Sequence, residues 1–213
     1  MALRNEPRNP SNNARAAATY NWQSWYGFVR QGATAIHESN PDVLVFLSGL
    51  SYDTYIEPVF LGTALTPGNQ RFSTNDFPGM AGKLVLEIHN YETDTNSCDS
   101  LKNNLYNKGF QAMHPEDRET VNVFPVMLTE FGFAMDASKY RQTYPQCLAT
   151  YLPQEKAGFF IWVVSGSYYI RGGKQEFDEA WGLVTKDWKE WRQPAYINGA
   201  FKQMVEGVKA YTK

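Results

Sequence analysis

Four segments of the chain are predominantly apolar, with continuous hydrophobic runs in place of a regular alternation of hydrophobic and polar positions. They cover residues 43–50, 84–91, 123–131 and 159–164. Runs of this kind are typical of strands that are buried on both faces of a parallel sheet. Residues 1–5 look like the end of one more strand.

Helical periodicity fills the segments between these predicted strands. From residue 21 to residue 38, apolar side chains recur at helical spacing, and Trp22 and Trp25 share the stripe. This pattern predicts an amphipathic helix that buries both tryptophans. A shorter helix is predicted to end near Gly109, because glycine suits the end of a helix.

Prolines constrain the two remaining predicted helices. Asp136 suits the N-cap of a helix that runs toward Leu152, and Pro145 must kink or restart that helix. Pro194 suits the first turn of a last helix. The buried face of this last helix is predicted to consist of Ile197, Phe201, Met204, Val205 and Val208.

The alternation of strands with helices predicts an α/β fold with a parallel sheet. No linker or internal repeat interrupts residues 1–213, so we expect a single domain. Two connections, residues 51–82 and 165–192, are longer than a single connection between a strand and a helix usually is. They are predicted to be loops on the carboxyl side of the sheet, where functional sites are usually built.

Composition narrows the classes of function. The chain is 43% hydrophobic and 20% charged, which is ordinary for a globular protein. A net charge of −2 provides no general attraction to nucleic acid or to an anionic membrane, so neither is an expected partner. The chain has no apolar run long enough for a transmembrane helix, and its first residues lack the apolar stretch of a signal peptide.

The chain contains two cysteines, Cys98 and Cys147. No Cys-x-x-Cys pair or cluster of His and Cys is present, so no structural metal site is predicted. Two reduced thiols and one disulfide are equally compatible with the sequence. A disulfide would suit a secreted protein.

Two glutamates stand just past apolar stretches. Glu6 lies between Asn5 and Pro7, and Glu130 follows the apolar residues 126–128. Two carboxylates at the carboxyl ends of different parallel strands can flank a glycosidic bond, one as acid and one as nucleophile. Taken singly, Glu6 also fits a solvated glutamate in a turn, and Glu130 also fits a strand-end glutamate paired with an arginine.

Further candidates stand near the ends of other predicted strands. Period-two alternation places His89 and Tyr91 on the same side of one strand, where a tyrosine hydroxyl could donate a hydrogen bond to a nucleophilic carboxylate. Trp162 could stack on a pyranose ring. Taken alone, His89 and Trp162 are more typical of core residues. The sequence does not choose which other tryptophans line a cleft among Trp181, Trp188 and Trp191.

The order of these motifs resembles the cellulase family of glycoside hydrolases, family five. Asn-Glu-Pro comes first, followed by His-x-Tyr, then Thr-Glu-Phe-Gly, and last a strand-end tryptophan. The resemblance extends from Met1 to about Trp191, and residues 181–183 look closest to fungal secreted members. It implies the C-terminal part of a (β/α)8 TIM barrel, strands four to eight, without the first three strands and most of the fourth.

The resemblance also implies a role for each candidate. Glu6 matches the family's acid/base, Glu130 its nucleophile, and Asn5 the asparagine that contacts the substrate 2-hydroxyl. The other residues that match substrate-binding positions are His89, Tyr91 and Trp162. The expected reaction is a retaining double displacement, with the two carboxyl groups about 5–5.5 Å apart and with no metal or organic cofactor.

Two functions are therefore expected from the sequence. The leading one is a partial catalytic domain of an endo-β-1,4-glucanase-like enzyme that cleaves β-linked oligo- or polysaccharides. In its complete form, the resemblance implies an extracellular monomer. The alternative is a truncated, non-catalytic carbohydrate-binding remnant, because the missing strands normally carry residues that support the nucleophile. The identity of the sugar does not follow from the sequence.

Overall fold

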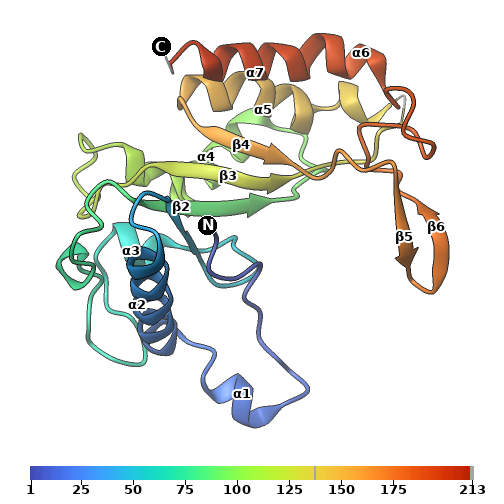
Figure 1. The fold of residues 1–213 in the computed structure, drawn as a ribbon. Coiled ribbons are helices and arrows are strands. Elements are labelled where there is room, and N and C mark those ends of the chain that lie inside the picture. The colour runs from blue at the N-terminus through green and yellow to red at the C-terminus, as the bar shows by residue number, and fades with distance from the viewer. Residues whose placement is uncertain (137, 212–213) are drawn as a thin grey trace. The chain divides into compact units, whose positions relative to one another are not determined.

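The computed structural model describes residues 1–136 and 138–211 (Figure 1). This part of the chain divides into two compact units. The first unit contains residues 1–89 and 105–127, and the second contains residues 90–104 and 128–211. None of the helices in the described residues is long and apolar enough to cross a membrane.

Four strands form a sheet in the order β1-β2-β3-β4. They are β1 (Val45–Ser48), β2 (Leu84–Asn90), β3 (Val126–Phe131) and β4 (Gly158–Ile161). In the first unit, β1 pairs with β2 in parallel, with Val45 opposite Leu84. All residues of β2 are buried, as expected for a strand covered on both faces. The four predicted strand segments and the α/β fold class are thereby confirmed.

The segment before β1 contributes only a single bridge to this sheet. Ala2 forms a parallel bridge with Phe46, and the Phe46 amide donates to the Met1 carbonyl at 2.9 Å. Residues 1–5 therefore lie beside β1, as their strand-like sequence predicts.

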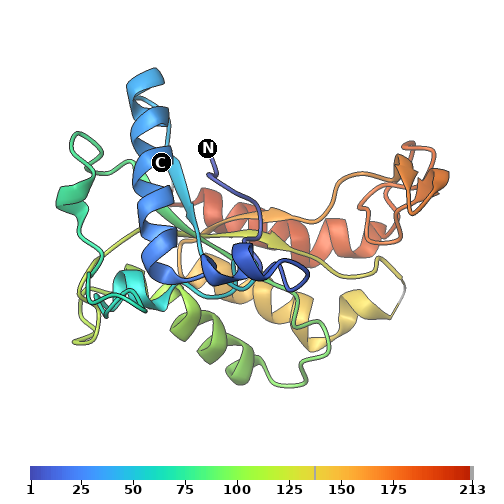
Figure 2. The ribbon, with the colours of Figure 1, turned by 90° about the horizontal axis from the view of Figure 1, so that it is seen from below.

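Helix α2 (Trp22–Ser39) packs beside β1 in the first unit (Figure 2). Its N-terminus is capped by Asn21, whose side chain accepts from the Ser24 amide at 2.9 Å. The predicted stripe is buried, and the Trp25 indole N–H donates to the Ser48 carbonyl at 2.7 Å. The assignment of Trp22 and Trp25 to the core is confirmed.

The long connection after β1 has some structure of its own. It contains helix α3 (Glu57–Phe60) and the 3-10 helix η1 (Thr74–Asp76). A short helix, α1 (Ala14–Ala18), precedes α2 and is capped by Asn13. Helix α4 (Cys98–Lys108) confirms the helix predicted before Gly109, and η2 (Phe110–Met113) follows it.

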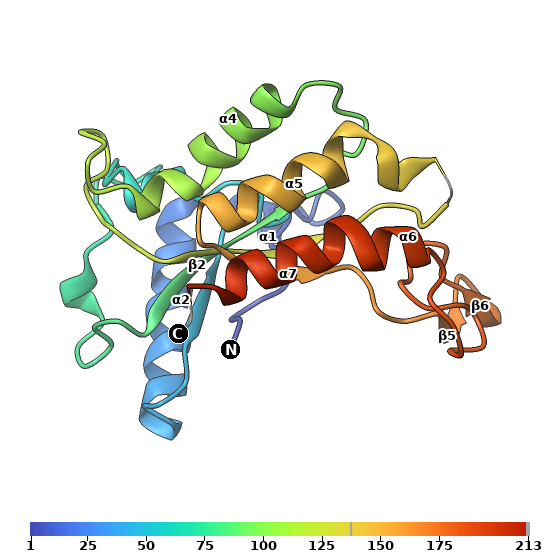
Figure 3. The same cartoon turned by 90° about the horizontal axis from the view of Figure 1, so that it is seen from above.

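Helices α5 (Thr143–Gln154) and α7 (Lys202–Lys209) lie side by side in the second unit (Figure 3). A Cβ added at Gly207 would lie 2.8 Å from the Pro153 side chain, so glycine permits their close approach. Segments α6 (Pro194–Tyr196) and η4 (Ile197–Phe201) lead into α7, with a kink at Gly199. Pro194 occupies the first turn, as predicted. Of the five apolar residues predicted to be buried on this last helix, only Met204 is fully buried.

The helix predicted to start at Asp136 begins later than expected. The Asp136 carboxylate accepts from the Lys139 amide at 2.8 Å, which closes a turn before η3 (Lys139–Arg141). Helix α5 then starts at Thr143, so Pro145 lies in its first turn, where proline is tolerated. Proline therefore marks a restart of the helix. Residue 137 lies outside the described residues.

A β-hairpin replaces part of the loop predicted over residues 165–192. Strand β5 (Ser167–Arg171) pairs antiparallel with β6 (Lys174–Asp178). The two turn residues, Gly172 and Gly173, have φ values of +58° and +73°. Two positive φ values are what a tight two-residue hairpin turn of type I′ requires, and glycine adopts them without strain.

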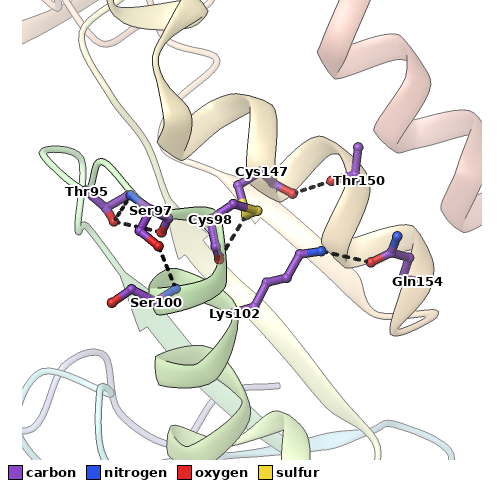
Figure 4. Close-up of a disulfide and its surroundings, with 8 residues drawn as sticks. All are labelled: Thr95, Ser97, Cys98, Ser100, Lys102, Cys147, Thr150 and Gln154. Carbon is purple, nitrogen blue, oxygen red and sulfur yellow. Dashed lines mark hydrogen bonds between the residues drawn. A yellow bond between two sulfur atoms is a disulfide. The ribbon is translucent and has the colours of Figure 1, made fainter.

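A disulfide joins Cys98 at the start of α4 to Cys147 in α5 (Figure 4). Both residues belong to the second unit, and their Cα atoms are 5.5 Å apart. In the same region, the Lys102 ammonium donates to the Gln154 side chain at 3.3 Å. The crosslink spans 49 residues of sequence, which is long enough to restrict the unfolded chain substantially.

Replacing both Cys98 and Cys147 by serine should lower the free energy of unfolding by about 4 kcal/mol, because the unfolded chain regains the entropy of an open loop. The measurement is the denaturation midpoint of the full-length protein in guanidinium chloride. The wild-type protein under strong reductant serves as a control and should shift in the same direction. Equal midpoints for the variant and the oxidised wild type would contradict the expectation.

Candidate active site

Glu6 lies in the first unit with its side chain partly exposed, at 19%. Its Oε1 atom lies 3.1 Å from His89 Nδ1, and its Oε2 atom lies 3.9 Å from the Arg8 guanidinium. The backbone of Glu6 has φ +49°, in the left-handed region, and its amide donates to Asp53 Oδ2 at 2.8 Å. A carboxylate with a solvent-facing side and a buried imidazole partner can exchange protons with a bound molecule.

His89 is buried near the carboxyl end of β2. Its Nε2 atom lies 3.7 Å from Asp53 Oδ2, and its amide donates to the Asp53 carbonyl at 2.9 Å. His89 is therefore both a buried core residue and a residue that contacts Glu6, so the core and site interpretations of His89 are compatible. The structure brings Glu6 and His89 together across 83 residues of sequence.

Asp53 forms a cluster with Glu6 and His89. It is a residue that the sequence pattern does not identify. It lies in the connection after β1 and is fully buried, with 0% of its surface exposed. Nothing in its neighbourhood is periodic, so the sequence pattern gives no sign of burial. The one available hint is that aspartate tolerates the left-handed conformation better than most residues do.

A groove of about 870 Å³ opens beside Glu6 within the first unit. Its lining is both charged and aromatic, and includes Arg4, Glu6, Arg8, Tyr20, Trp25 and Tyr52. The neighbouring residue Asn5 is exposed. A groove that combines ring faces with charged and hydroxyl groups is suited to a polar ligand with apolar faces.

Glu130 lies in the second unit near the end of β3. The Tyr91 hydroxyl donates to Glu130 Oε1 at 2.5 Å, a short hydrogen bond of the kind made to a carboxylate. This contact joins two predicted site residues in the way that the sequence suggests.

Trp162 and Gly132 fix the backbone next to Glu130. The Trp162 amide donates to the Phe131 carbonyl at 2.7 Å. A Cβ at Gly132 would lie 2.1 Å from the Trp162 carbonyl oxygen, so only glycine fits after Glu130 and Phe131 at this close approach. The glycine of the Glu-Phe-Gly sequence thus has a steric reason. The Trp162 side chain is half-buried.

Trp181 packs against Tyr91, the hydrogen-bond donor to Glu130, in the second unit. Its ring centroid lies 5.7 Å from that of Tyr91, and its amide donates to the buried Glu179 carboxylate at 3.0 Å. Trp188 and Trp191 are exposed. Of these three tryptophans, Trp181 is therefore the one with a ring contact to a predicted site residue among the described contacts.

Tyr144 supports the strand end between His89 and Tyr91. Its buried hydroxyl donates to the Asn90 carbonyl in the second unit. Burial raises the pKa of Tyr144 well above its ordinary value, because the charged phenolate would be desolvated. The hydroxyl therefore stays protonated and remains a hydrogen-bond donor at neutral pH.

Comparison with known proteins identifies a family whose sequence profile matches most of this chain. The sequence profile of "Cellulase (glycosyl hydrolase family 5)" matches residues 1–167. A "Glycosyl hydrolase 5 family protein" from Chamaecyparis obtusa is 28% identical over 188 residues, which make up 82% of this chain and 31% of that protein.

Solved structures share the fold. The native form of a β-glucanase from Saccharophagus degradans has a TM-score of 0.62 at 16% identity, covering 97% of this chain and 53% of that chain. The same enzyme in complex with cellotetraose gives 0.63 at 15% identity, with the same coverage. The catalytic domain of the major endoglucanase from Xanthomonas campestris pv. campestris gives 0.58 at 17% identity, covering 93% and 53%.

The chain spans about a third of the length of the curated relative and about half of each of these solved chains. At these identities the structural likenesses show the fold alone. That fold is an α/β arrangement with a parallel sheet, shared with about half of each related barrel.

Proposed function

Because the chain belongs to the cellulase family, glycosyl hydrolase family 5, we propose that the whole protein cleaves β-linked glycans by a double displacement with two glutamates. The observation that carries the proposal is that the family match over residues 1–167 includes both Glu6 and Glu130. Each glutamate also has a hydrogen-bonding partner suited to its proposed role.

In the first step, Glu130 is the nucleophile and Glu6 is the acid. A carboxylate oxygen of Glu130 bonds to the anomeric carbon while the bond from that carbon to the leaving oxygen breaks. The proton of Glu6 moves to the leaving oxygen. The products of this step are a glycosyl ester on Glu130, a free sugar end and an ionised Glu6.

In the second step, water attacks the anomeric carbon and the ester bond to Glu130 breaks. Glu6 accepts the proton of that water and returns to its starting state. Two displacements at one carbon restore the original β configuration, so the proposed reaction retains stereochemistry. The step consumes one water and requires no cofactor.

The proposed substrate-binding residues complete these roles. The Tyr91 hydroxyl donates to Glu130 and orients its carboxylate. Asn5 is proposed to contact the 2-hydroxyl of the sugar, and Trp162 to stack on its ring, as the family resemblance implies.

The proposed substrate is a β-1,4-glucan, cleaved within the chain. The support is that a solved relative is named a β-glucanase in complex with cellotetraose and another is named an endoglucanase. We further propose that the whole protein acts outside the cell as a monomer, as the resemblance to fungal secreted members implies.

Glu130→Gln in the full-length protein should lower kcat on cellotetraose by at least about 10³-fold, because the amide cannot form the ester intermediate. Binding of cellotetraose, measured by calorimetry, should stay within a few-fold of wild type. The matched control is Glu38→Gln, an exposed position at the end of α2. Binding without measurable hydrolysis in the wild-type protein would instead favour a non-catalytic carbohydrate-binding function.

Glu6→Ala should impair substrates according to their leaving group. Hydrolysis of cellotetraose should fall about 10²–10⁴-fold, because its leaving alcohol needs a proton. A 2,4-dinitrophenyl β-cellobioside leaves without protonation, so formation of the glycosyl ester should be almost unaffected. Added azide should then speed turnover by replacing water as the nucleophile. An equal loss with both substrates and no azide effect would contradict the acid/base role.

Tyr91→Phe should lower kcat/KM on cellotetraose roughly 10- to 100-fold, because Glu130 loses a charge-assisted hydrogen bond. The ring contact with Trp181 is retained, so the thermal unfolding midpoint should change little. The control is Tyr169→Phe in the exposed hairpin. Unchanged kinetics in Tyr91→Phe would exclude a role of this hydroxyl in supporting the nucleophile.

A further inference from the structure

Asp53 contacts two residues of the first-unit cluster but has no part in the reaction steps above. Its Oδ2 atom accepts from the Glu6 amide at 2.8 Å and lies 3.7 Å from His89 Nε2. Its carbonyl also accepts from the His89 amide at 2.9 Å. One fully buried residue thus contacts the backbone of Glu6 and both the ring and the backbone of His89.

The backbone around Asp53 adopts the left-handed conformation, which residues other than glycine disfavour. Ser51, Tyr52 and Asp53 have φ values of +52°, +63° and +59° in succession. Residues other than glycine adopt this conformation at a cost in free energy, so the surrounding contacts must impose it. Strained backbone segments of this kind are concentrated at functional sites, where a particular geometry is required.

Hydrogen bonds from this segment fix the position of the chain at Glu6 and Pro7. The Tyr52 amide donates to the Pro7 carbonyl at 3.0 Å, next to the contact between Asp53 and the Glu6 amide. The Tyr20 hydroxyl also donates to the Pro7 carbonyl, at 3.2 Å, and accepts from the Ser51 amide at 2.6 Å. The left-handed segment, residues 51–53, therefore fixes the position of the backbone from which the Glu6 side chain extends.

The negative charge of Asp53 needs a reason beyond this backbone contact. A neutral asparagine could accept the same N–H, without the cost of burying a carboxylate. The ring of His89 is one group that a charge at Asp53 affects, because Nε2 faces Asp53 and Nδ1 faces Glu6. A carboxylate on the Nε2 side favours the tautomer with its proton on Nε2 and orients the ring.

We propose that Asp53 is a positioning residue for Glu6, acting through its backbone and through the orientation of His89. With a proton on Nε2, a neutral His89 presents Nδ1 as an acceptor to a protonated Glu6. As an imidazolium, His89 donates from Nδ1 to an ionised Glu6. Both forms of Glu6 that a double displacement requires then have a partner. The inference rests on the acid/base role proposed for Glu6.

The test is Asp53→Asn in the full-length protein, because asparagine keeps an acceptor for the Glu6 amide and removes only the charge. On cellotetraose, kcat should fall about 10- to 100-fold while KM changes less than about threefold. On 2,4-dinitrophenyl β-cellobioside, formation of the glycosyl ester should fall less than about threefold. The control is Asp42→Asn, an exposed aspartate of the first unit.

A purely structural role would lower both activities by the same factor, because it would act through the amount of folded protein. An equal fall, or no fall, therefore overturns the inference. Glu6→Ala is measured in parallel. If that variant does not discriminate between the leaving groups, the proposed function fails; if it does and Asp53→Asn does not, only the inference about Asp53 fails.

Tyr20→Phe provides a second variant in case Asp53→Asn does not fold. It removes the hydroxyl that connects Ser51 and Pro7 and leaves Asp53 in place. We expect a smaller fall, about 3- to 10-fold, again confined to cellotetraose, as befits the loss of neutral hydrogen bonds. Equal activities of Tyr20→Phe and wild type on both substrates would overturn the proposed positioning by this segment.

Discussion

Two candidate clusters, one in each unit, depend on the carboxyl end of β2 and the residues that follow it. His89 Nδ1 lies 3.1 Å from Glu6 Oε1, and two residues later the Tyr91 hydroxyl donates to Glu130 Oε1 at 2.5 Å. Asn90 lies between them, and its carbonyl accepts from the buried Tyr144 hydroxyl. A shift of one residue in the register of β2 would turn His89 and Tyr91 to the opposite face of the sheet, away from their glutamates.

Burial determines how strongly each of these contacts acts. His89 and Asp53 are buried, so the interaction between imidazole and carboxylate is weakly screened by water. The Arg8 guanidinium is more than half exposed and lies 3.9 Å from Glu6, so solvent screens its effect on the glutamate. The position of the Glu6 carboxylate therefore depends more on its contact with buried His89 than on Arg8.

The sequence predicts the regular part of this structure well because burial leaves a pattern. Continuous apolar runs located all four strands, and helical spacing located α2. The β5–β6 hairpin was missed although Gly172 and Gly173 form its turn, because its strands are mostly exposed and lack an apolar pattern. Asp53 could not be predicted, because its burial depends on the contacts of an irregular loop with residues distant in sequence.

The most direct test of the double displacement is to trap its ester intermediate. The full-length protein would be incubated with 2,4-dinitrophenyl 2-deoxy-2-fluoro-β-cellobioside, digested with pepsin and mapped by mass spectrometry. Fluorine at the 2-position slows both formation and hydrolysis of the ester, whereas the good leaving group speeds formation alone, so the intermediate should accumulate. The account predicts a single fluorocellobiosyl group on Glu130. A label on another residue, or hydrolysis of cellotetraose with inversion at the anomeric carbon, would contradict it.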